Sequence, residues 1–152
     1  NDDKGKKIVD FFKANNVNVD GLQVDSEYKT GDVKVMLNEK GSASYDIKYP
    51  RAWDKIELTE TAKSLAKSSD AFIFGSLVTR DDESRNTLYK LLPLAKFKIF
   101  DVNLRKPYYT KDILVYLMNQ ADFIKFNDDE IFEISKYLNS NSQSLEQNIR
   151  FI

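Results

Sequence analysis

The second half of the chain alternates short apolar runs with amphipathic helical segments, and this order restricts the fold more than any other feature. The apolar runs recur at nearly equal spacing, at Ala71–Phe74, Phe97–Phe100 and Phe123–Phe126. Helical patterns that begin at common N-capping residues alternate with them, at Thr59, Asp81, Thr110 and Asn127. Strands that alternate with helices predict an α/β fold: a parallel sheet with right-handed crossovers and helices on both faces.

The first half of the chain has a different pattern. A helical pattern over residues 5–14 ends at residues 15–16, and two segments with alternating apolar and polar residues follow, at Val33–Leu37 and Ala43–Ile47. The intervening Asn38-Glu39-Lys40-Gly41 is typical of a turn, with glycine in its last position. We therefore predict a β-hairpin with one apolar face.

We expect three regions in the chain. Residues 1–20 form a helix of the α/β core, residues 21–55 form a β lid with a further short strand near Leu22–Val24, and residues 56–152 form a βαβαβα core with a helical tail from Ser144. A small hairpin is marginally stable alone, so its apolar face must cover a ligand, the main body or another subunit. Three parallel strands leave open edges and faces, so we expect an incomplete domain that is truncated at both ends.

Composition excludes several classes of function. The 152 residues include no cysteine and no histidine, which excludes a disulfide framework, a cysteine nucleophile, the usual zinc sites and a histidine-based triad within the chain. The formal net charge of -1 argues against binding to nucleic acid, and no apolar run approaches the roughly 18 residues of a membrane span. The absence of cysteine is compatible with a cytoplasmic location.

Polar residues follow each predicted strand, at the edge where parallel sheets bind ligands. The first group, Asn127-Asp128-Asp129-Glu130, has two interpretations that can coexist. Asn127 and Glu130 have the spacing of a variant capping box, which needs no further function. The same two residues at a helix N-terminus can also bind phosphate, with Glu130 holding Mg²⁺ through water.

The other strand ends carry weaker candidates. Asn103 can hydrogen-bond sugar hydroxyls and Arg105 can contact a phosphate or developing charge, although Arg105 in a structural ion pair is an equal alternative. Gly75 permits close approach of a ligand or merely tight packing. Trp53 is a core residue or a wall of a sugar pocket. We expect the nearby residues Thr79, Arg80 and Arg85 to be solvated.

Two phosphate-binding motifs are absent from the sequence. It contains no Gly-x-x-x-x-Gly-Lys-Ser/Thr and no Gly-x-Gly-x-x-Gly, since its glycines are scattered. A P-loop enzyme is thereby excluded, and a nucleotide-binding oxidoreductase becomes a weak alternative.

Taken in order, the motifs resemble the ribokinase/PfkB family of carbohydrate kinases, and most closely its fructokinases. The residues that carry the resemblance occur in family order along nearly the whole chain: Thr30-Gly31 with Val33–Leu37, Ser44-Tyr45-Asp46-Ile47, Ala52-Trp53-Asp54, Phe74-Gly75-Ser76-Leu77, Ser84-Arg85, Thr87-Leu88, Phe100-Asp101-Val102-Asn103-Leu104-Arg105 and Asn127-x-x-Glu130.

The resemblance implies a ribokinase-like (Rossmann-like) fold with a β lid, and transfer of the γ-phosphate of ATP to a sugar hydroxymethyl group with Mg²⁺. It places Asn127 and Glu130 near the phosphates and the metal, and Asn103 and Arg105 toward the sugar and the transferred phosphate, with Arg105 as a charge stabiliser. It also implies a homodimer that forms through the β lid.

The family motifs Gly-Gly and Gly-Ala-Gly-Asp, of which the second supplies the anion hole and the catalytic aspartate, are absent from this sequence. We therefore expect no catalytic residue in this chain and no activity from the chain alone. The alternative from another class is a non-catalytic α/β interaction module that docks through its hairpin.

Overall fold

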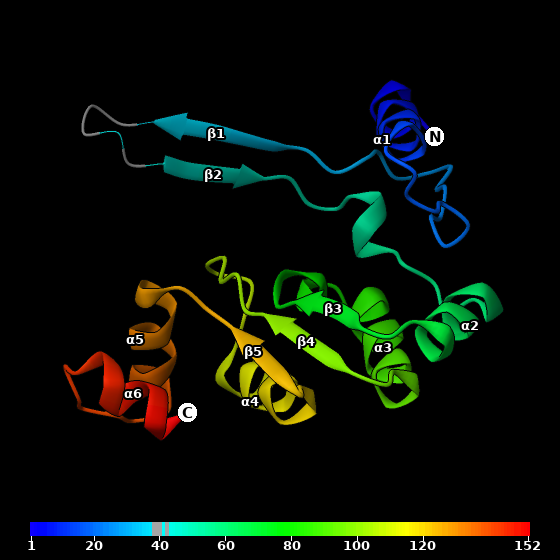
Figure 1. Cartoon of the computed structure of the whole chain (residues 1–152). Helices are drawn as coiled ribbons and strands as arrows, with labels where there is room; N and C mark the ends of the chain where they lie inside the picture. Colours follow the sequence, from blue (N-terminus) through cyan, green and yellow to red (C-terminus); the bar gives the residue numbers. More distant parts are fainter. Residues whose placement is uncertain (38–40, 42) are drawn as a thin grey trace.

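The computed structural model describes residues 1–37, 41 and 43–152 of the chain. Within them it contains an antiparallel hairpin and a three-stranded sheet, together with α-helices and short 3-10 helices (Figure 1). The elements in chain order are α1 (Asp3–Ala14), β1 (Val33–Leu37), β2 (Ala43–Ile47), η1 (Ala52–Asp54), α2 (Glu60–Ser68), β3 (Phe72–Gly75), η2 (Leu77–Arg80), α3 (Asp82–Leu91), η3 (Leu92–Leu94), β4 (Lys98–Asp101), α4 (Lys111–Gln120), β5 (Phe123–Lys125), α5 (Asp128–Tyr137) and α6 (Leu145–Phe151).

The predicted parallel sheet is confirmed, with strand order β3-β4-β5. Each strand lies within one residue of its predicted bounds. The central register pairs Phe74 with Phe100 and Phe100 with Ile124, so the strand ends that carry Gly75, Asp101 and Lys125 also lie side by side. Because the strands are parallel, the loops that leave these ends share one edge of the sheet.

Each helix of the sheet region begins at its predicted cap. The side-chain oxygens of Thr59, Asp81, Thr110 and Asn127 accept hydrogen bonds from backbone N–H groups in the first turns of α2, α3, α4 and α5. The predicted tail helix is also present as α6, with Ser144 as its N-cap. These bonds satisfy N–H groups that have no partner inside the helix, which explains why local sequence located the starts so closely.

One face of the sheet forms the core. The rings of Phe74 and Phe100 stack at a centroid distance of 5.2 Å, and Leu92, Leu117 and Ile134 belong to the same buried cluster. These last three residues come from the region of α3, from α4 and from α5, so the helices that follow the strands supply the cover for this face. Burial of large apolar side chains here is the main source of stability.

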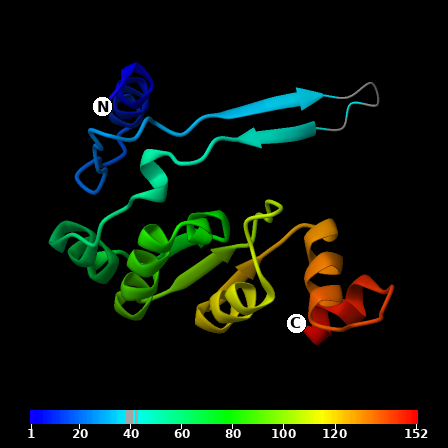
Figure 2. The same cartoon turned by 180° about the vertical axis from the view of Figure 1, so that it is seen from behind.

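The opposite face of the sheet is largely exposed among the described residues. Ile73, Ile99 and Phe123 pair across this face, and Ile73 and Phe123 keep 69% and 54% of their accessible surface. The strands follow one another in sheet order, and crossovers of one hand between successive neighbours all lie on one side. Figure 2 shows α3 and α4 together on that side of the sheet.

The predicted hairpin is present as the antiparallel pair β1 and β2, in which Val33 faces Ile47 and Val35 faces Tyr45. Residues 38–40 of the predicted turn lie outside the described residues, and Gly41 has the left-handed φ of 76° that favours glycine. The predicted strand near residues 22–24 is wrong. The side-chain amide of Gln23 makes two 2.8 Å hydrogen bonds with the backbone of Glu57, so an amide pair holds this segment in place of a strand ladder.

The hairpin projects from the sheet region along the edge at which the parallel strands end (Figures 1 and 2). All of β1 is exposed, and α1 has no buried residue. In both views α1 lies beside the chain that leads into the hairpin, away from β3, β4 and β5. The assignment of residues 1–20 to the α/β core therefore stays a prediction.

The unequal faces of the sheet give a stability prediction. Phe100→Ala should lower the free energy of unfolding by about 3–5 kcal/mol, because the fully buried ring leaves a cavity. Phe123→Ala in the next strand is the matched control and should cost far less, because that ring is half exposed. Urea unfolding of both variants measures the difference. Equal losses would show that the face with Phe123 is also covered in solution.

Candidate functional site

A cavity of about 410 Å³ lies between the hairpin and the loop that follows β4. We call it the lid cavity. It is lined by residues 45–47 of β2, by Leu104, Arg105, Lys106, Tyr108 and Tyr109 of the loop, and by Glu133 of α5. Figure 1 shows this loop rising from the end of β4 toward the hairpin. The cavity thus lies at the carboxyl edge of the sheet, where the sequence predicts a ligand.

Arg105 is the predicted site residue that lines the lid cavity. Its guanidinium carbon lies 4.9 Å from the centre of the Tyr45 ring, and its Nη1 atom donates a 2.8 Å hydrogen bond to the carbonyl of Leu104. Arg105 forms no ion pair within the described residues, so the alternative prediction of a structural ion pair is wrong for this part of the chain. A guanidinium that rests on a ring beneath a lid is available to an anion.

The loop that carries Arg105 is attached to α5 by a polar cluster. The Tyr109 hydroxyl donates a hydrogen bond to Glu133, and the Lys106 ammonium lies 2.8 Å from the same carboxylate. Burial, and then the hydrogen bond to Glu133, raises the pKa of Tyr109, so its phenol stays protonated and keeps donating. The cluster therefore holds the loop against α5 at Lys106 and Tyr109, just C-terminal to Arg105.

Asn127 and Glu130 form the predicted capping box. Asn127 accepts a 2.9 Å hydrogen bond from the N–H of Glu130, and Glu130 Oε2 accepts a 3.0 Å bond from the N–H of Asn127. Glu130 Oε1 also accepts a 2.9 Å bond from the N–H of Leu104. The carboxylate is buried, with 7% of the residue exposed. Glu130 thus joins the start of α5 to the loop between Asn103 and Arg105.

The predicted role of Glu130 in holding Mg²⁺ through water stays a prediction. Both Glu130 oxygens accept hydrogen bonds from backbone N–H groups. Across residues 1–37, 41 and 43–152, no group of three or more acidic, cysteine or histidine side chains could hold a metal ion. Each Glu130 oxygen accepts one N–H bond and keeps a second lone pair, which is enough to bind a water of a hydrated Mg²⁺ ion.

Asn103 and Gly75 line neither the lid cavity nor the second cavity described below. Asn103 is exposed and has the positive φ of 42° that asparagine tolerates, and its carbonyl accepts a 3.4 Å bond from the Ser76 hydroxyl. A Cβ atom at Gly75 would lie 3.2 Å from the carbonyl oxygen of Asp101. Close approach of β3 to β4 therefore explains Gly75, as the packing interpretation predicts.

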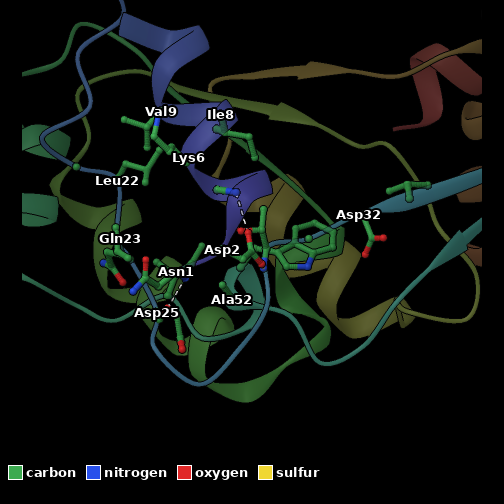
Figure 3. Close-up of a pocket in the computed structure, with 18 residues that line it drawn as sticks. Asn1, Asp2, Lys6, Ile8, Val9, Leu22, Gln23, Asp25, Asp32 and Ala52 are labelled. Atoms are coloured by element: carbon green, nitrogen blue, oxygen red, sulfur yellow. Dashed lines mark hydrogen bonds between the residues drawn. The ribbon is translucent and has the colours of Figure 1, made fainter.

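Trp53 lines the second cavity, of about 730 Å³, between α1 and the segments that lead into and out of the hairpin. Its walls are mostly apolar, with Ile8, Val9 and Leu22 around the space shown in Figure 3. Asp2, labelled in the same figure, accepts 2.8 Å and 2.9 Å hydrogen bonds from the N–H groups of Gly5 and Thr30. These bonds lower the pKa of its carboxyl group. Trp53 and Arg105 thus belong to two different cavities.

Arg80 and Thr79 correct the expectation that this stretch is solvated. The Arg80 side chain is only 1% exposed and forms a two-bond ion pair with Asp54, at 2.6 and 2.8 Å. Thr79 is fully buried, and its hydroxyl donates to the Ser76 carbonyl. Arg85 is partly exposed and pairs with Asp82. No local pattern identifies the Arg80–Asp54 pair, because its partners are far apart in the sequence.

No helix within the described part of the chain is long and apolar enough to cross a membrane.

The fold is similar to those of solved sugar kinases. An uncharacterized sugar kinase from Pyrococcus horikoshii, solved in complex with ATP, has a TM-score of 0.79 and 24% identity over 90% of this chain and 48% of its own. A fructokinase from Vibrio cholerae has a TM-score of 0.73 and 19% identity over 100% of this chain and 53% of its own.

The curated relatives that are similar in sequence are also named as sugar kinases. Probable fructokinase-7 of Arabidopsis thaliana and fructokinase-2 of Zea mays are each 26% identical to the chain over 140 residues. The match covers 86% of this chain but only 41% and 42% of those relatives, so the chain spans about two-fifths of their length. The family profile described as pfkB family carbohydrate kinase matches residues 1–149, and the chain therefore belongs to that family.

Proposed function

We propose that this chain is the lid and part of the sheet of an ATP-dependent sugar kinase, most simply a fructokinase, that phosphorylates a sugar hydroxymethyl group. Family membership and the fructokinase names of the relatives support this proposal. The single observation that carries it is the position of Arg105, beneath Tyr45 of the lid and at the carboxyl edge of the parallel sheet.

The residues of this chain would act mainly by position and charge. Phosphoryl transfer needs positioning and stabilisation of charge more than covalent chemistry by the protein. Arg105 would stabilise the transferred phosphoryl group, and Asn103, two residues earlier, would bind the sugar. Contacts of Gly75 and Trp53 with the sugar stay predictions, because neither residue lines the lid cavity.

ATP is the proposed phosphate donor, supported by the ATP complex of the solved sugar kinase from Pyrococcus horikoshii. The N-terminus of α5, with Asn127 as its cap, offers a positive dipole end near the Arg105 loop, which favours phosphate. Mg²⁺ would arrive on the nucleotide phosphates with its own waters, as is usual for this ion in kinases.

The hairpin supports a second candidate function. Val33, Val35 and Leu37 keep 49%, 57% and 70% of their surface exposed on one face of β1, and Tyr45 opposite Val35 keeps 49%. We propose that a second copy of the lid covers the part of this face that lies along β1, beyond the contact of Tyr45 with Arg105, in a homodimer. A foreign protein on the same face is the alternative, in which the chain is a docking module.

Arg105 provides the main test of the kinase proposal. In the full-length kinase that contains this segment, Arg105→Ala should lower kcat/KM for fructose by about 10²- to 10³-fold, because a preorganised positive charge is lost. Arg150→Ala in the exposed part of α6 is the control and should leave turnover unchanged. A coupled ADP-release assay measures both. Unchanged turnover in the Arg105 variant would remove the site assignment, and turnover by the 152-residue chain alone would contradict its expected inactivity.

A substitution at Glu130 tests whether this residue only caps α5 or also binds the metal ion. Glu130→Gln should lower the free energy of unfolding by about 1–3 kcal/mol, because a charged acceptor of buried N–H bonds is lost. The Mg²⁺ concentration for half-maximal activity of the full-length kinase should not change. Glu146→Gln, at an exposed ion pair, is the control. An increase of about tenfold or more in the Mg²⁺ requirement would show that Glu130 binds the metal.

The lid face gives a test of assembly. Val35→Glu should convert a dimer to a monomer in sedimentation velocity runs, because a carboxylate would be buried without a partner. Met36→Glu is the matched control: Met36 is 55% exposed on the opposite face of the same strand. If the unmodified chain is a monomer at every concentration tested, the homodimer proposal is wrong and the docking alternative gains support.

A further inference from the structure

The lid is attached to the sheet region through a small set of residues just beyond β2. The strands of the hairpin are largely exposed, and the chain returns to the main body through η1. At this point Tyr49 donates a 2.8 Å hydrogen bond to Asp81, and the Lys55 ammonium lies 2.9 Å from the same carboxylate. The position of the lid therefore depends on contacts between residues 48–55 and the segment that follows β3.

Arg80 lies at the centre of these contacts. Its Nε and Nη2 atoms donate to the two oxygens of Asp54 at 2.6 and 2.8 Å, and Nη2 also donates to the Lys48 carbonyl at 2.7 Å. Lys48 is the first residue after β2, so one guanidinium binds both the exit of the lid and η1. Asp54 in turn accepts a bond from the Arg51 N–H, which fixes the turn between them.

Three aromatic rings surround the same guanidinium. Its central carbon lies 5.2 Å from the ring of Tyr49, 4.7 Å from that of Trp53 and 5.0 Å from that of Tyr108. Tyr49 and Trp53 belong to the lid attachment, whereas Tyr108 belongs to the loop that carries Arg105. Arg80 thus contacts Tyr108 in the loop wall of the lid cavity and the chain just beyond its hairpin wall, although it does not line the cavity itself.

Stability alone is a poor explanation for this arrangement. Both charged side chains are 1% exposed, and Nη1 of Arg80 has no hydrogen-bond partner among the described residues. Buried ion pairs are often no more stable than apolar residues of the same volume, and an unpaired buried donor adds a further penalty. The guanidinium does provide directional bonds in a rigid plane, which an apolar cluster lacks.

We propose that Arg80 is a positioning residue that sets the lid at a fixed place over the Arg105 loop. Its planar fork holds Asp54 and Lys48 on the lid side, and its face holds Tyr108 on the loop side. Lysine carries the same charge but lacks both the fork and the flat face, so it cannot replace arginine here. The consequence for sugar phosphorylation rests on the proposed function, whereas the effect on the lid does not.

The experiment measures the lid directly. Because the chain contains no cysteine, Lys34→Cys on β1 and Lys90→Cys on α3, both at exposed positions, can carry a pair of spin labels. Their distance distribution is recorded for the labelled chain and for the same chain with Arg80→Lys or Arg80→Met. We expect a distribution about twofold broader in both variants, because neither side chain keeps the two-bond fork. The single tryptophan, Trp53, should become more accessible to acrylamide in parallel.

Two comparisons keep the result decisive. Arg150→Lys and Arg150→Met alter an exposed ion pair in α6 and should leave the distribution unchanged. Circular dichroism reports whether the sheet region stays folded. A distribution in Arg80→Lys that matches the unmodified chain would overturn the proposal. Loss of the folded signal in both Arg80 variants would overturn it too, since the pair would then be an element of general folding. The two proposals can fail separately. If the Arg80 variants give the broader distance distribution but the full-length protein shows no sugar kinase activity, the lid proposal holds and only the proposed function is wrong.

Discussion

The bond network of one buried carboxylate, Glu130, determines where the polar loop after β4 lies. The carboxylate accepts N–H bonds from Asn127, at the start of α5, and from Leu104, in the loop. A helix start and a strand exit are thereby joined at a single point. Because Leu104 lies between Asn103 and Arg105, the same bonds limit where those two side chains can reach. A residue that serves as a helix cap thus also builds the edge at which parallel sheets bind ligands.

The lid is held in place by a different kind of interaction from the sheet region. The sheet region is held by apolar burial on one face, around Phe74 and Phe100. The hairpin buries little, so its place is set by directional bonds and ring contacts at its base, around Arg80. Apolar packing is strong but tolerant of small shifts, whereas a two-bond ion pair fixes direction. A rigid body with a separately anchored cover is an arrangement that fits the proposed binding of a small molecule in the lid cavity.

The sequence was most informative where the cause of structure is local. Helix starts at Thr59, Asp81, Thr110 and Asn127 depend on side chains that bond within their own first turn, so they could be predicted. The open sheet face depends on which elements cover it, and alternation of strands and helices does not show that. The segment at Gln23 is held by a bond to Glu57, and no local pattern marks a side chain that pairs with a distant backbone.

The same reasoning explains the candidate site. Arg105 was predicted at the sheet edge because the end of a strand can be read from sequence, and it does line the lid cavity there. Arg80 was missed because Asp54 and the three rings around it come from separate segments. A chain without histidine or cysteine must build its charged and titratable sites from guanidinium, ammonium, phenol and carboxylate groups. Those groups hold charge and geometry better than they exchange protons at neutral pH, and charge and geometry are what phosphoryl transfer demands most of a protein.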